Sequence, residues 1–336
     1  MIMKTKKVKS ASVLGAIALT LAVTSCSSST PAGAAASGSK PKNNQVSFVA
    51  AQMTSTYFAV MECGAKAAAK KYQVNLDWQG ASDWDIHTQI PLINAAEQRQ
   101  PAGMVLVPTD PVALGETVSK IMADHIPVIT VDGSLNKPVE LQNIRTENTS
   151  AGALAADALA ASMGEAGTVL VIASFPGVAA NAERVDGFVK QMAKAHPNIT
   201  VRPTEYSKAD QATASQITAA ALTNPNLKGI YTTLEPASAG AAAAIRAAGK
   251  IGKVKLVAYD ADATQVKDLK AGVYDALVAQ DPYGLGYDSV ERIAQIISGH
   301  LDPKTLTYQT YVKAFIITRA NADTKEAQAH IYVPTC

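Results

Sequence analysis

From residue 45 onward, short apolar and β-branched runs alternate with Ala-rich stretches that are typical of helices. Strands are predicted over Gln45–Ala51, Val74–Gln79, Gly103–Pro108, Pro127–Val131, Gly167–Ala173, Ile199–Tyr206, Gly229–Thr233 and Val254–Tyr259. Helices are predicted over Tyr57–Tyr72, Asp85–Arg99, Val112–Asp124, Ala179–Ala195, Gln211–Leu222, Ser238–Ala248 and Ala263–Ala271. Pro91 lies inside the second helical pattern, which leaves the start of that helix open.

The predicted strands are apolar throughout, which indicates burial on both faces and therefore a parallel sheet. Repeated strand–helix units predict an α/β fold of the doubly wound kind. The number of units exceeds one sheet of usual size, so we expect two parallel-sheet lobes with a ligand cleft between them. The break is expected near Ile144–Ser150, where the strand-like run Leu141–Arg145 leads into a new helix.

The residues that follow each strand are candidates for the site, because ligands of open parallel sheets bind beyond the carboxyl ends of the strands. The candidates are Met53 to Phe58, Trp84, Thr109, Asp110, Asp132, Ser174, Phe175, Leu234, Glu235, Asp260, Gln280 and Asp281. Asp110 precedes Pro111, so we expect it to cap a helix rather than to bind a ligand.

The first 26 residues predict export. Four lysines within the first nine residues precede an uncharged, mostly apolar run over Ala11–Ala22, and small residues then lead to Cys26. This order is typical of a secretory signal, and the run is shorter than the about 20 residues that span a bilayer. Cys26 resembles the lipidated Cys of a bacterial lipobox; the alternative is an ordinary signal peptide with Cys26 merely near the cut. We predict a signal peptide over 1–25 and a lipidated, flexible tether over 26–44.

Charge argues against a nucleic-acid partner. The chain has 336 residues and a formal net charge of +2, and removal of the four signal lysines leaves a mature chain near −2. No basic face emerges from the sequence, and no apolar run after the signal is long enough for a membrane span. The about 290 residues after the tether suit two domains of ordinary size.

The chain has three cysteines, Cys26, Cys63 and Cys336. If a lipid takes Cys26, the even remainder in an exported protein suggests a disulfide between Cys63 and Cys336. Such a bond would clip the last residue onto the first helix, and the long closed loop gives at most roughly 5 kcal/mol of stabilisation. The alternative is two unpaired thiols, with Cys63 packed on the inner face of its helix.

The sequence predicts no metal site, no cofactor and no catalytic activity. The five histidines are scattered, with no pair at helical spacing and no Cys nearby. Gly284-Leu285-Gly286 lacks the third Gly of a phosphate-binding loop, and the chain has no Gly-x-Ser-x-Gly nucleophile motif. We therefore expect a binding protein that is not an enzyme.

Five short sequence segments, taken in order along the chain, resemble those of one protein family. They are Pro108-Thr109-Asp110, Ile126–Asp132, Glu183–Phe188, Val257–Ala261 and Ala279–Pro282. By their spacing, residues 45–320 resemble the periplasmic sugar-binding proteins of the ribose type, the substrate receptors of ABC importers. The resemblance implies a multi-strand hinge, in which the chain crosses between the two lobes near Glu147, Gln280 and residues 310–313.

The same resemblance implies the division of the chain and its ligand positions. The first lobe would comprise 45–146 and 281–310, and the second 147–280 and 311–336, with a return of the tail to the first lobe as the alternative. In this family aromatic rings pack on a small sugar and polar groups bind its hydroxyls. The ligand-binding positions carried over are Tyr57, Phe58, Asp132, Arg184, Asp260 and Gln280. Trp84, as an extra stacking face, and Glu235 are added because each follows a strand.

Each candidate has a simpler alternative role. Asp132 and Asp260 could be caps, Arg184 could pair with Asp186 or Glu183 on a helix surface, Trp84 could pack on the surface, and Gln280 could bind only backbone. One of Tyr57 and Phe58 is expected in the core, and Phe58 is preferred for the cleft.

Departures from the family pattern argue against ribose. Where ribose-type members carry Asn, Asn, Arg and Asn, this chain has Ser55, Val107, Gly133 and Leu234. A buried hydroxyl without a partner costs roughly 1–3 kcal/mol, so several such losses are incompatible with tight ribose binding. We predict a different sugar, a deoxy-sugar or a polyol.

The sequence thus predicts a monomeric, extracytoplasmic lipoprotein, anchored to the bacterial cell membrane, that delivers a sugar or polyol to an ABC permease. The alternative is a receptor of the same fold that signals to a membrane kinase or chemoreceptor. A transcription regulator of the lactose-repressor type would need a helix-turn-helix, which residues 1–44 do not provide.

Overall fold

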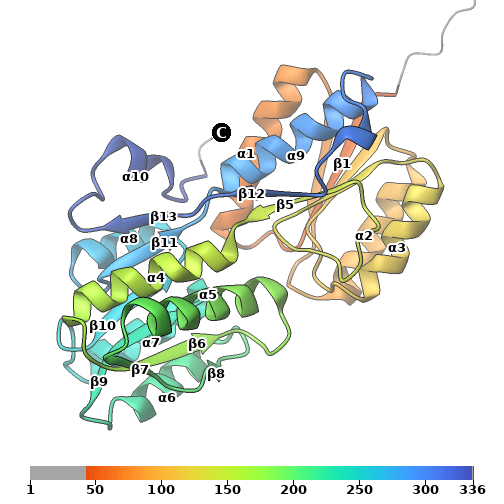
Figure 1. The fold of residues 1–336 in the computed structure, drawn as a ribbon. Helices are drawn as coiled ribbons and strands as arrows, with labels where there is room; N and C mark the ends of the chain where they lie inside the picture. The colour runs from red at the N-terminus through yellow and green to blue at the C-terminus, as the bar shows by residue number, and fades with distance from the viewer. Residues whose placement is uncertain (1–42, 335) are drawn as a thin grey trace, which may run out of the picture. The chain divides into compact units, whose positions relative to one another are not determined.

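A computed structural model describes residues 43–334 and 336, so the predictions for the signal peptide, Cys26 and most of the tether lie outside the described residues. Residues 43–336 form one unit that contains two sheets (Figure 1). The alternation of apolar strands and helices is therefore confirmed as a two-sheet α/β fold.

The first sheet has the strand order β12-β5-β4-β3-β1-β2, and all its pairings are parallel. Its strands are β1 (Gln45–Ala50), β2 (Asn75–Gly80), β3 (Gly103–Leu106), β4 (Val128–Val131), β5 (Gln142–Thr146) and β12 (Gln309–Val312). Four helices pack with it: α1 (Thr56–Tyr72), α2 (Ile86–Gln98), α3 (Ala113–Ala123) and α9 (Pro282–Ile297). We call this sheet with its helices the first lobe.

The second sheet has the order β13-β11-β10-β9-β6-β7, with β8 paired to β6. Its strands are β6 (Gly167–Ala173), β7 (Ile199–Val201), β8 (Glu205–Tyr206), β9 (Leu227–Thr232), β10 (Lys255–Tyr259), β11 (Ala276–Ala279) and β13 (Phe315–Thr318). Only the β11–β13 pairing of this sheet is antiparallel. The helices of this second lobe are α4 (Asn148–Met163), α5 (Ala179–Ala195), α6 (Gln211–Ala221), α7 (Glu235–Ala247), α8 (Ala263–Lys270) and α10 (Lys325–Ala329). A 3₁₀ turn, η1 (Pro303–Thr305), precedes β12 of the first sheet.

The chain passes between the two sheets at three points: after β5, after β11 and between β12 and β13. Each sheet is covered on both faces, since separate apolar clusters lie under α1 and α9 and under α2 and α3 in the first lobe. In the second lobe, one cluster lies under α4 and α5, and the other under α6, α7 and α8. The carboxyl ends of the strands of both lobes are thereby left for the site.

Glycines on both helices allow α4 and α5 to approach closely. A Cβ on Gly187 of α5 would lie 1.9 Å from the carbonyl oxygen of Thr149 on α4, and one on Gly152 of α4 would lie 2.1 Å from the carbonyl oxygen of Arg184. Neither helix could keep its position with a larger residue there. This contact fixes α5, which carries a side chain of the site described below, against α4.

Some local predictions were wrong. Ile199–Tyr206 forms the two short strands β7 and β8, because Pro203 between them has no N–H to continue the pairing with β6. By contrast, the helix predicted over Asp85–Arg99 is confirmed, since α2 spans Ile86–Gln98 with Asp85 as its cap and contains Pro91. α9 was not predicted as a helix.

Candidate ligand-binding site

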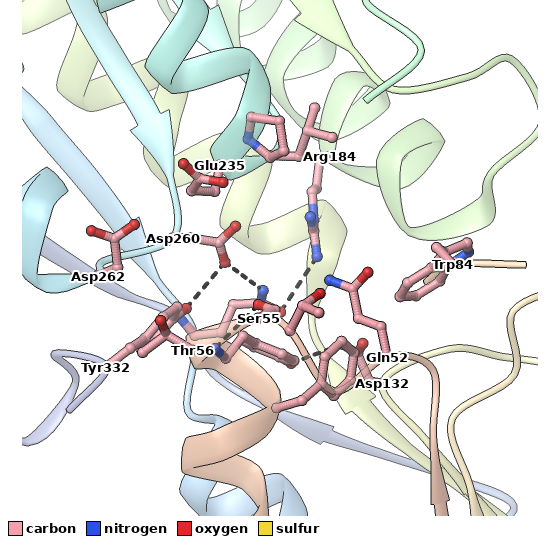
Figure 2. A pocket seen from close by; sticks show the side chains of 16 residues that line it. Gln52, Ser55, Thr56, Trp84, Asp132, Arg184, Glu235, Asp260, Asp262 and Tyr332 are labelled. Carbon is pink, nitrogen blue, oxygen red and sulfur yellow. Dashed lines mark hydrogen bonds between the residues drawn. The ribbon is translucent and has the colours of Figure 1, made fainter. Parts of the chain in front are cut away.

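A cavity of about 500 Å³ lies at the carboxyl ends of strands from both lobes (Figure 2). It is lined by Gln52, Thr54, Ser55, Thr56, Tyr57, Phe58, Trp84, Asp132, Arg184, Leu234, Glu235, Pro236, Asp260, Asp262, Gln280 and Tyr332. We call this the interlobe cavity. All eight residues predicted to bind a ligand are among its lining residues, although they come from segments spread over most of the chain.

Asp132 places a buried carboxylate at the end of β4. Its backbone has a φ of 64°, in the left-handed region, and its N–H donates to the carbonyl oxygen of Ile144 at 2.9 Å. The Tyr57 hydroxyl donates to Oδ1 of Asp132 at 2.8 Å. Burial raises the pKa of Asp132, while the Arg184 charge and the Tyr57 hydrogen bond counteract the rise. Non-glycine residues hold such backbone conformations where the surrounding structure enforces them, as at binding sites.

Asp260 repeats this arrangement in the second lobe, at the end of β10. Its φ is 74°, and its N–H donates to Val278. Oδ1 accepts from Gln280 Nε2 at 2.9 Å and from the Tyr332 hydroxyl at 3.1 Å. Burial raises the pKa of Asp260, against the charge of Arg184 and these two hydrogen bonds.

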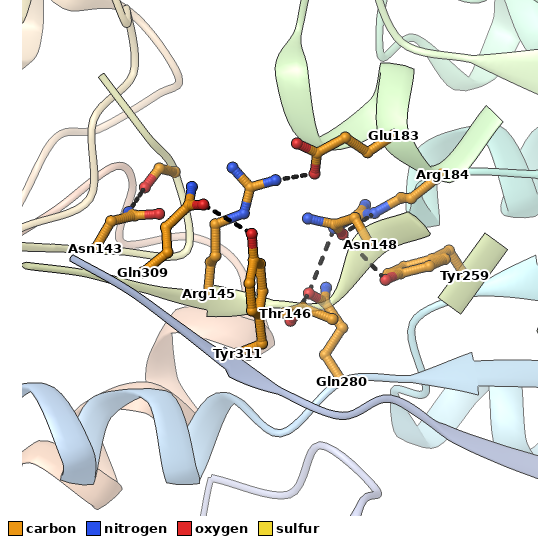
Figure 3. Close-up of polar contacts among 11 residues, drawn as sticks. Asn143, Arg145, Thr146, Asn148, Glu183, Arg184, Tyr259, Gln280, Gln309 and Tyr311 are labelled. Atoms are coloured by element: carbon orange, nitrogen blue, oxygen red, sulfur yellow. Dashed lines mark hydrogen bonds and ion pairs between the residues drawn. The ribbon is translucent and has the colours of Figure 1, made fainter. Parts of the chain in front are cut away.

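Arg184 is a buried cation between the lobes (Figure 3). Its Nε donates to Asn148 at 2.8 Å, and its two terminal nitrogens donate to the Thr233 carbonyl at 2.9 Å and to Gln280 Oε1 at 3.3 Å. The guanidinium carbon lies 3.7 Å from the centre of the Tyr259 ring. Arg184 does not pair on the helix surface with Asp186 or Glu183, so that alternative was wrong; Asp186 pairs instead with Lys190.

Gln280 joins the two lobes at the second crossing. Besides contacting Arg184 and Asp260, its Oε1 accepts from the hydroxyl of Thr146 in β5 at 2.7 Å. A second link lies beside it, since buried Arg145 of β5 forms an ion pair with Glu183 of α5 (Figure 3). Both contacts therefore run from the first sheet to the second lobe, next to the interlobe cavity.

Glu235 begins α7 and is half-buried. Among the residues that the structure describes, no cationic side chain forms an ion pair with it. Burial, and then the charges of Asp262 and Asp260, raise its pKa to about 7. Asp262 is committed in part to α8, whose Thr264 and Gln265 N–H groups donate to it at 2.6 and 2.9 Å.

Aromatic rings form the wall on the first lobe. Ser55 caps α1 by accepting from the Tyr57 N–H, which sets both Tyr57 and Phe58 at the start of the helix. Ring centroids are 5.2 Å apart for Tyr57 and Phe58, and 6.2 Å apart for Phe58 and Trp84. Trp84 is 47% exposed and donates to the Thr109 carbonyl. Both Tyr57 and Phe58 line the cavity, and both also belong to the buried apolar cluster of the first lobe.

The other candidates lie elsewhere or act differently. Asp110 accepts from the N–H groups of Val112 and Ala113, both at 2.8 Å, so its predicted capping role is confirmed. Phe175 lines a separate pocket with Tyr206. A Cβ on Gly133 would lie 2.8 Å from the Pro108 carbonyl oxygen, so this position has no room for a side chain.

The sequence analysis missed Gln52, Asp262 and Tyr332. Gln52 directly follows the first strand run, and Asp262 is two residues beyond Asp260, so a wider window after each strand could have found both. Tyr332 comes from the C-terminal segment, where no strand-end pattern points to it. Within residues 43–334 and 336, no cluster of three His, Cys, Asp or Glu could hold a metal ion, and no helix is long and apolar enough to cross a membrane.

Comparison with known proteins gives one consistent result. Residues 46–301 match the family model described as periplasmic binding protein domain. The chain is 26% identical to the ribose import binding protein of Haemophilus influenzae, over 82% of this chain and 94% of that protein. It is 25% identical to a xylitol-binding protein of Mycolicibacterium smegmatis, over 62% of this chain and 60% of that protein.

Solved structures agree with this result. An ABC transporter solute-binding protein from Agrobacterium vitis, bound with α-D-tagatopyranose, superposes with a TM-score of 0.81 at 29% identity. The match covers 86% of this chain and 99% of that one. A second solute-binding protein from the same organism, with bound D-fucose, gives a TM-score of 0.78 at 28% identity, over 86% and 100% of the two chains.

Proposed function

Because the chain belongs to the periplasmic binding protein family, we propose that it is an extracytoplasmic receptor that captures a small sugar or polyol other than ribose and delivers it to an ABC importer. The observation that carries this proposal is the interlobe cavity, in which two buried carboxylates, one from each lobe, face aromatic rings. The tagatose and D-fucose bound in two related structures, and a relative named as a xylitol-binding protein, support the ligand class.

The cavity suits hydroxyl groups. Asp132 and Asp260 each use Oδ1 for contacts within the protein, and their Oδ2 atoms bond no other described side chain. Each free oxygen can accept from a ligand hydroxyl, and hydrogen bonds to an ionised acceptor are the stronger kind. Tyr57, Phe58 and Trp84 offer apolar surfaces for the C–H faces of a sugar.

Charge narrows the ligand class further. Four carboxylates, those of Asp132, Glu235, Asp260 and Asp262, line the cavity with a single guanidinium, that of Arg184. Every nitrogen of that guanidinium already donates to a protein acceptor. An anionic sugar would meet uncompensated repulsion in a desolvated site, so we propose a neutral polyhydroxylated ligand and not a sugar acid or sugar phosphate.

The departures from the ribose-type pattern support a solute other than ribose. Ser55 is occupied in capping α1, Val107 is fully buried and Gly133 has no side chain to offer. We further propose that Cys26 carries a lipid that anchors the monomeric protein to the membrane, and that the protein binds its ligand without turnover.

A thermal-shift screen of the mature protein tests the proposal. A panel of pentoses, hexoses, deoxy-sugars and polyols should contain at least one compound that raises the melting temperature, since ligand at 100 times its dissociation constant adds about 2.7 kcal/mol. Calorimetric titration with D-ribose should show no sub-micromolar binding. The matched control is D132N/D260N, which should remove the shift for the same compound. A panel without any shift, or a shift that survives in this variant, refutes the proposed site.

A further inference from the structure

The C-terminal tail, which we define as residues 319–334 with Cys336, connects the two lobes beside the interlobe cavity. It follows β13 and first packs on the second lobe (Figure 1). Ala322 and Ala327 are buried there in the apolar cluster. Lys270 of α8 forms an ion pair with Asp323 at 2.6 Å. The tail is therefore a built part of the second lobe up to α10.

Tyr332 then leaves that surface and enters the interlobe cavity, where it is 3% exposed. Its N–H donates to the carbonyl oxygen of Ala261 at 2.9 Å, which holds it beside the end of β10. Its hydroxyl accepts from the Gln280 N–H at 3.0 Å and donates to Asp260 at 3.1 Å (Figure 2). The ring meanwhile lies 5.6 Å from the Tyr57 ring and belongs to the apolar cluster of the first lobe.

The end of the tail is bonded to the first lobe. Cys336 forms a disulfide with Cys63 of α1, with the two Cα atoms 4.9 Å apart. The same helix carries Tyr57 and Phe58, the aromatic pair of the cavity. The disulfide predicted from the cysteine count is therefore present, and it clips the last residue of the chain onto the first helix.

We propose that Tyr332 is a positioning residue of the ligand site, and that the Cys63–Cys336 disulfide is what keeps it there. This inference rests on the proposed function, because the groups that Tyr332 orients, Asp260 and Gln280, are the proposed ligand contacts. The phenol fixes one carboxylate oxygen of Asp260 and leaves the other for a hydroxyl of the ligand.

The geometry explains why a covalent clip is needed. Tyr332 contacts both lobes, so any hinge opening pulls on it from two sides. Four residue steps separate it from Cys336, a span of at most roughly 14 Å for an extended chain. With the disulfide intact, the tail end stays with α1 and Tyr332 remains within reach of Asp260. Without it, the exposed residues Val333 and Pro334 are no longer tied to α1, and Tyr332 can leave the cavity.

The test follows the titration of Asp260 by ¹³C NMR of its carboxyl group in the ligand-free mature protein. The hydrogen bond from Tyr332 lowers the pKa of this carboxyl, so its loss should move the midpoint to higher pH. The charged and titratable groups that also face Asp260 are Arg184, Asp132, Glu235, Asp262, Tyr57, Tyr231 and Tyr259, and all of them remain in the variants.

Y332F, which keeps the ring in place, should show this upward displacement. C336A and the wild-type protein reduced with a phosphine should both show a lower midpoint, because departure of the tail lets water reach Asp260 and burial is the larger cause of its raised pKa. Y283F is the matched control, because Tyr283 is an exposed phenol on α9, and it should leave the midpoint unchanged. Far-UV circular dichroism checks that each sample is folded. If C336A does not fold, the reduced wild-type protein replaces it in the comparison.

Two results would overturn the inference. An unchanged midpoint in Y332F removes the positioning role of the phenol. A changed midpoint in Y332F with an unchanged one in both C336A and the reduced protein shows that the tail holds Tyr332 without the disulfide. Neither result depends on a sugar. The sugar screen can therefore fail while the NMR test succeeds, and the NMR test can fail while the sugar screen succeeds.

Discussion

Replacement of Glu235 by Gln should stabilise the protein at pH 8 and leave its stability near pH 4 unchanged. The side chain is half-buried next to two other carboxylates, and its pKa rises from the ordinary 4.5 to about 7. A carboxyl whose pKa is higher in the folded state holds its proton more tightly there than in the unfolded chain. Its contribution is therefore fully present below pH 4.5 and is lost as the pH rises through about 7.

The magnitude follows from the size of this rise. The difference in pKa corresponds to about 3 kcal/mol at full effect, since each unit is worth about 1.4 kcal/mol. Water reaches the half-buried carboxyl and screens its neighbours, which reduces the expected effect to about 1–2 kcal/mol. For a chain of this size, about 2 °C of melting temperature corresponds to each kcal/mol, so Glu235→Gln should melt about 2–4 °C higher than wild type at pH 8.

The assay is differential scanning calorimetry of ligand-free protein at half-unit steps from pH 4 to pH 8.5. The melting-temperature difference between Glu235→Gln and wild type should grow through pH 5 to 7 and then level off. Glu116→Gln, an exposed change on α3 of the other lobe, should run parallel to wild type throughout. Parallel curves for Glu235→Gln and wild type would refute the reasoning, since they would place this carboxyl in an ordinary, solvated environment.

Four further outcomes are expected. Arg184→Lys should weaken binding of any sugar found in the screen at least tenfold by calorimetry, because an ammonium cannot reach the three acceptors that the guanidinium bonds; unchanged affinity would contradict this. Gly187→Ala should lower the free energy of unfolding by about 1–3 kcal/mol in urea titrations, since its Cβ meets the α4 backbone; equal midpoints would argue against this helix contact. Loss of the disulfide in C63A/C336A should lower the free energy of unfolding by up to roughly 5 kcal/mol and raise the ligand-free radius of gyration in X-ray scattering. If neither quantity changes, the disulfide does not restrain the two lobes. Trp84→Ala should weaken sugar binding with little loss of stability, because the ring is 47% exposed; a large drop in melting temperature would assign it to packing instead.

Much of the fold follows from the sequence, because long apolar runs and helical patterns depend on local residues. The strands β1, β3, β4, β6 and β10 all lie within predicted runs, and β9 begins two residues before its predicted run. Interpretation failed where tertiary contacts decide the structure. The single strand predicted over residues 199–206 is divided in two at Pro203, and α9 was not predicted as a helix.

The site shows the same division. Asp132 and Asp260 were predictable because each follows an apolar strand, and strand ends meet at one edge of a sheet. Tyr332 was not predicted, since the disulfide places only the last residue of the chain, and the path of the tail through the cavity depends on contacts of Tyr332 with Ala261, Gln280 and Asp260. The half-buried state of Glu235, which gives its unusual titration, likewise depends on distant neighbours.

The order of the strands has a consequence for synthesis. Each sheet receives its last strand late, β12 at Gln309–Val312 and β13 at Phe315–Thr318. A nascent chain that has reached residue 300 has therefore finished neither half of the molecule, and the two halves cannot mature one after the other as separate domains usually do. A polypeptide that is truncated before that point exposes an unpaired edge on each of the two sheets, which makes it prone to aggregation and proteolysis.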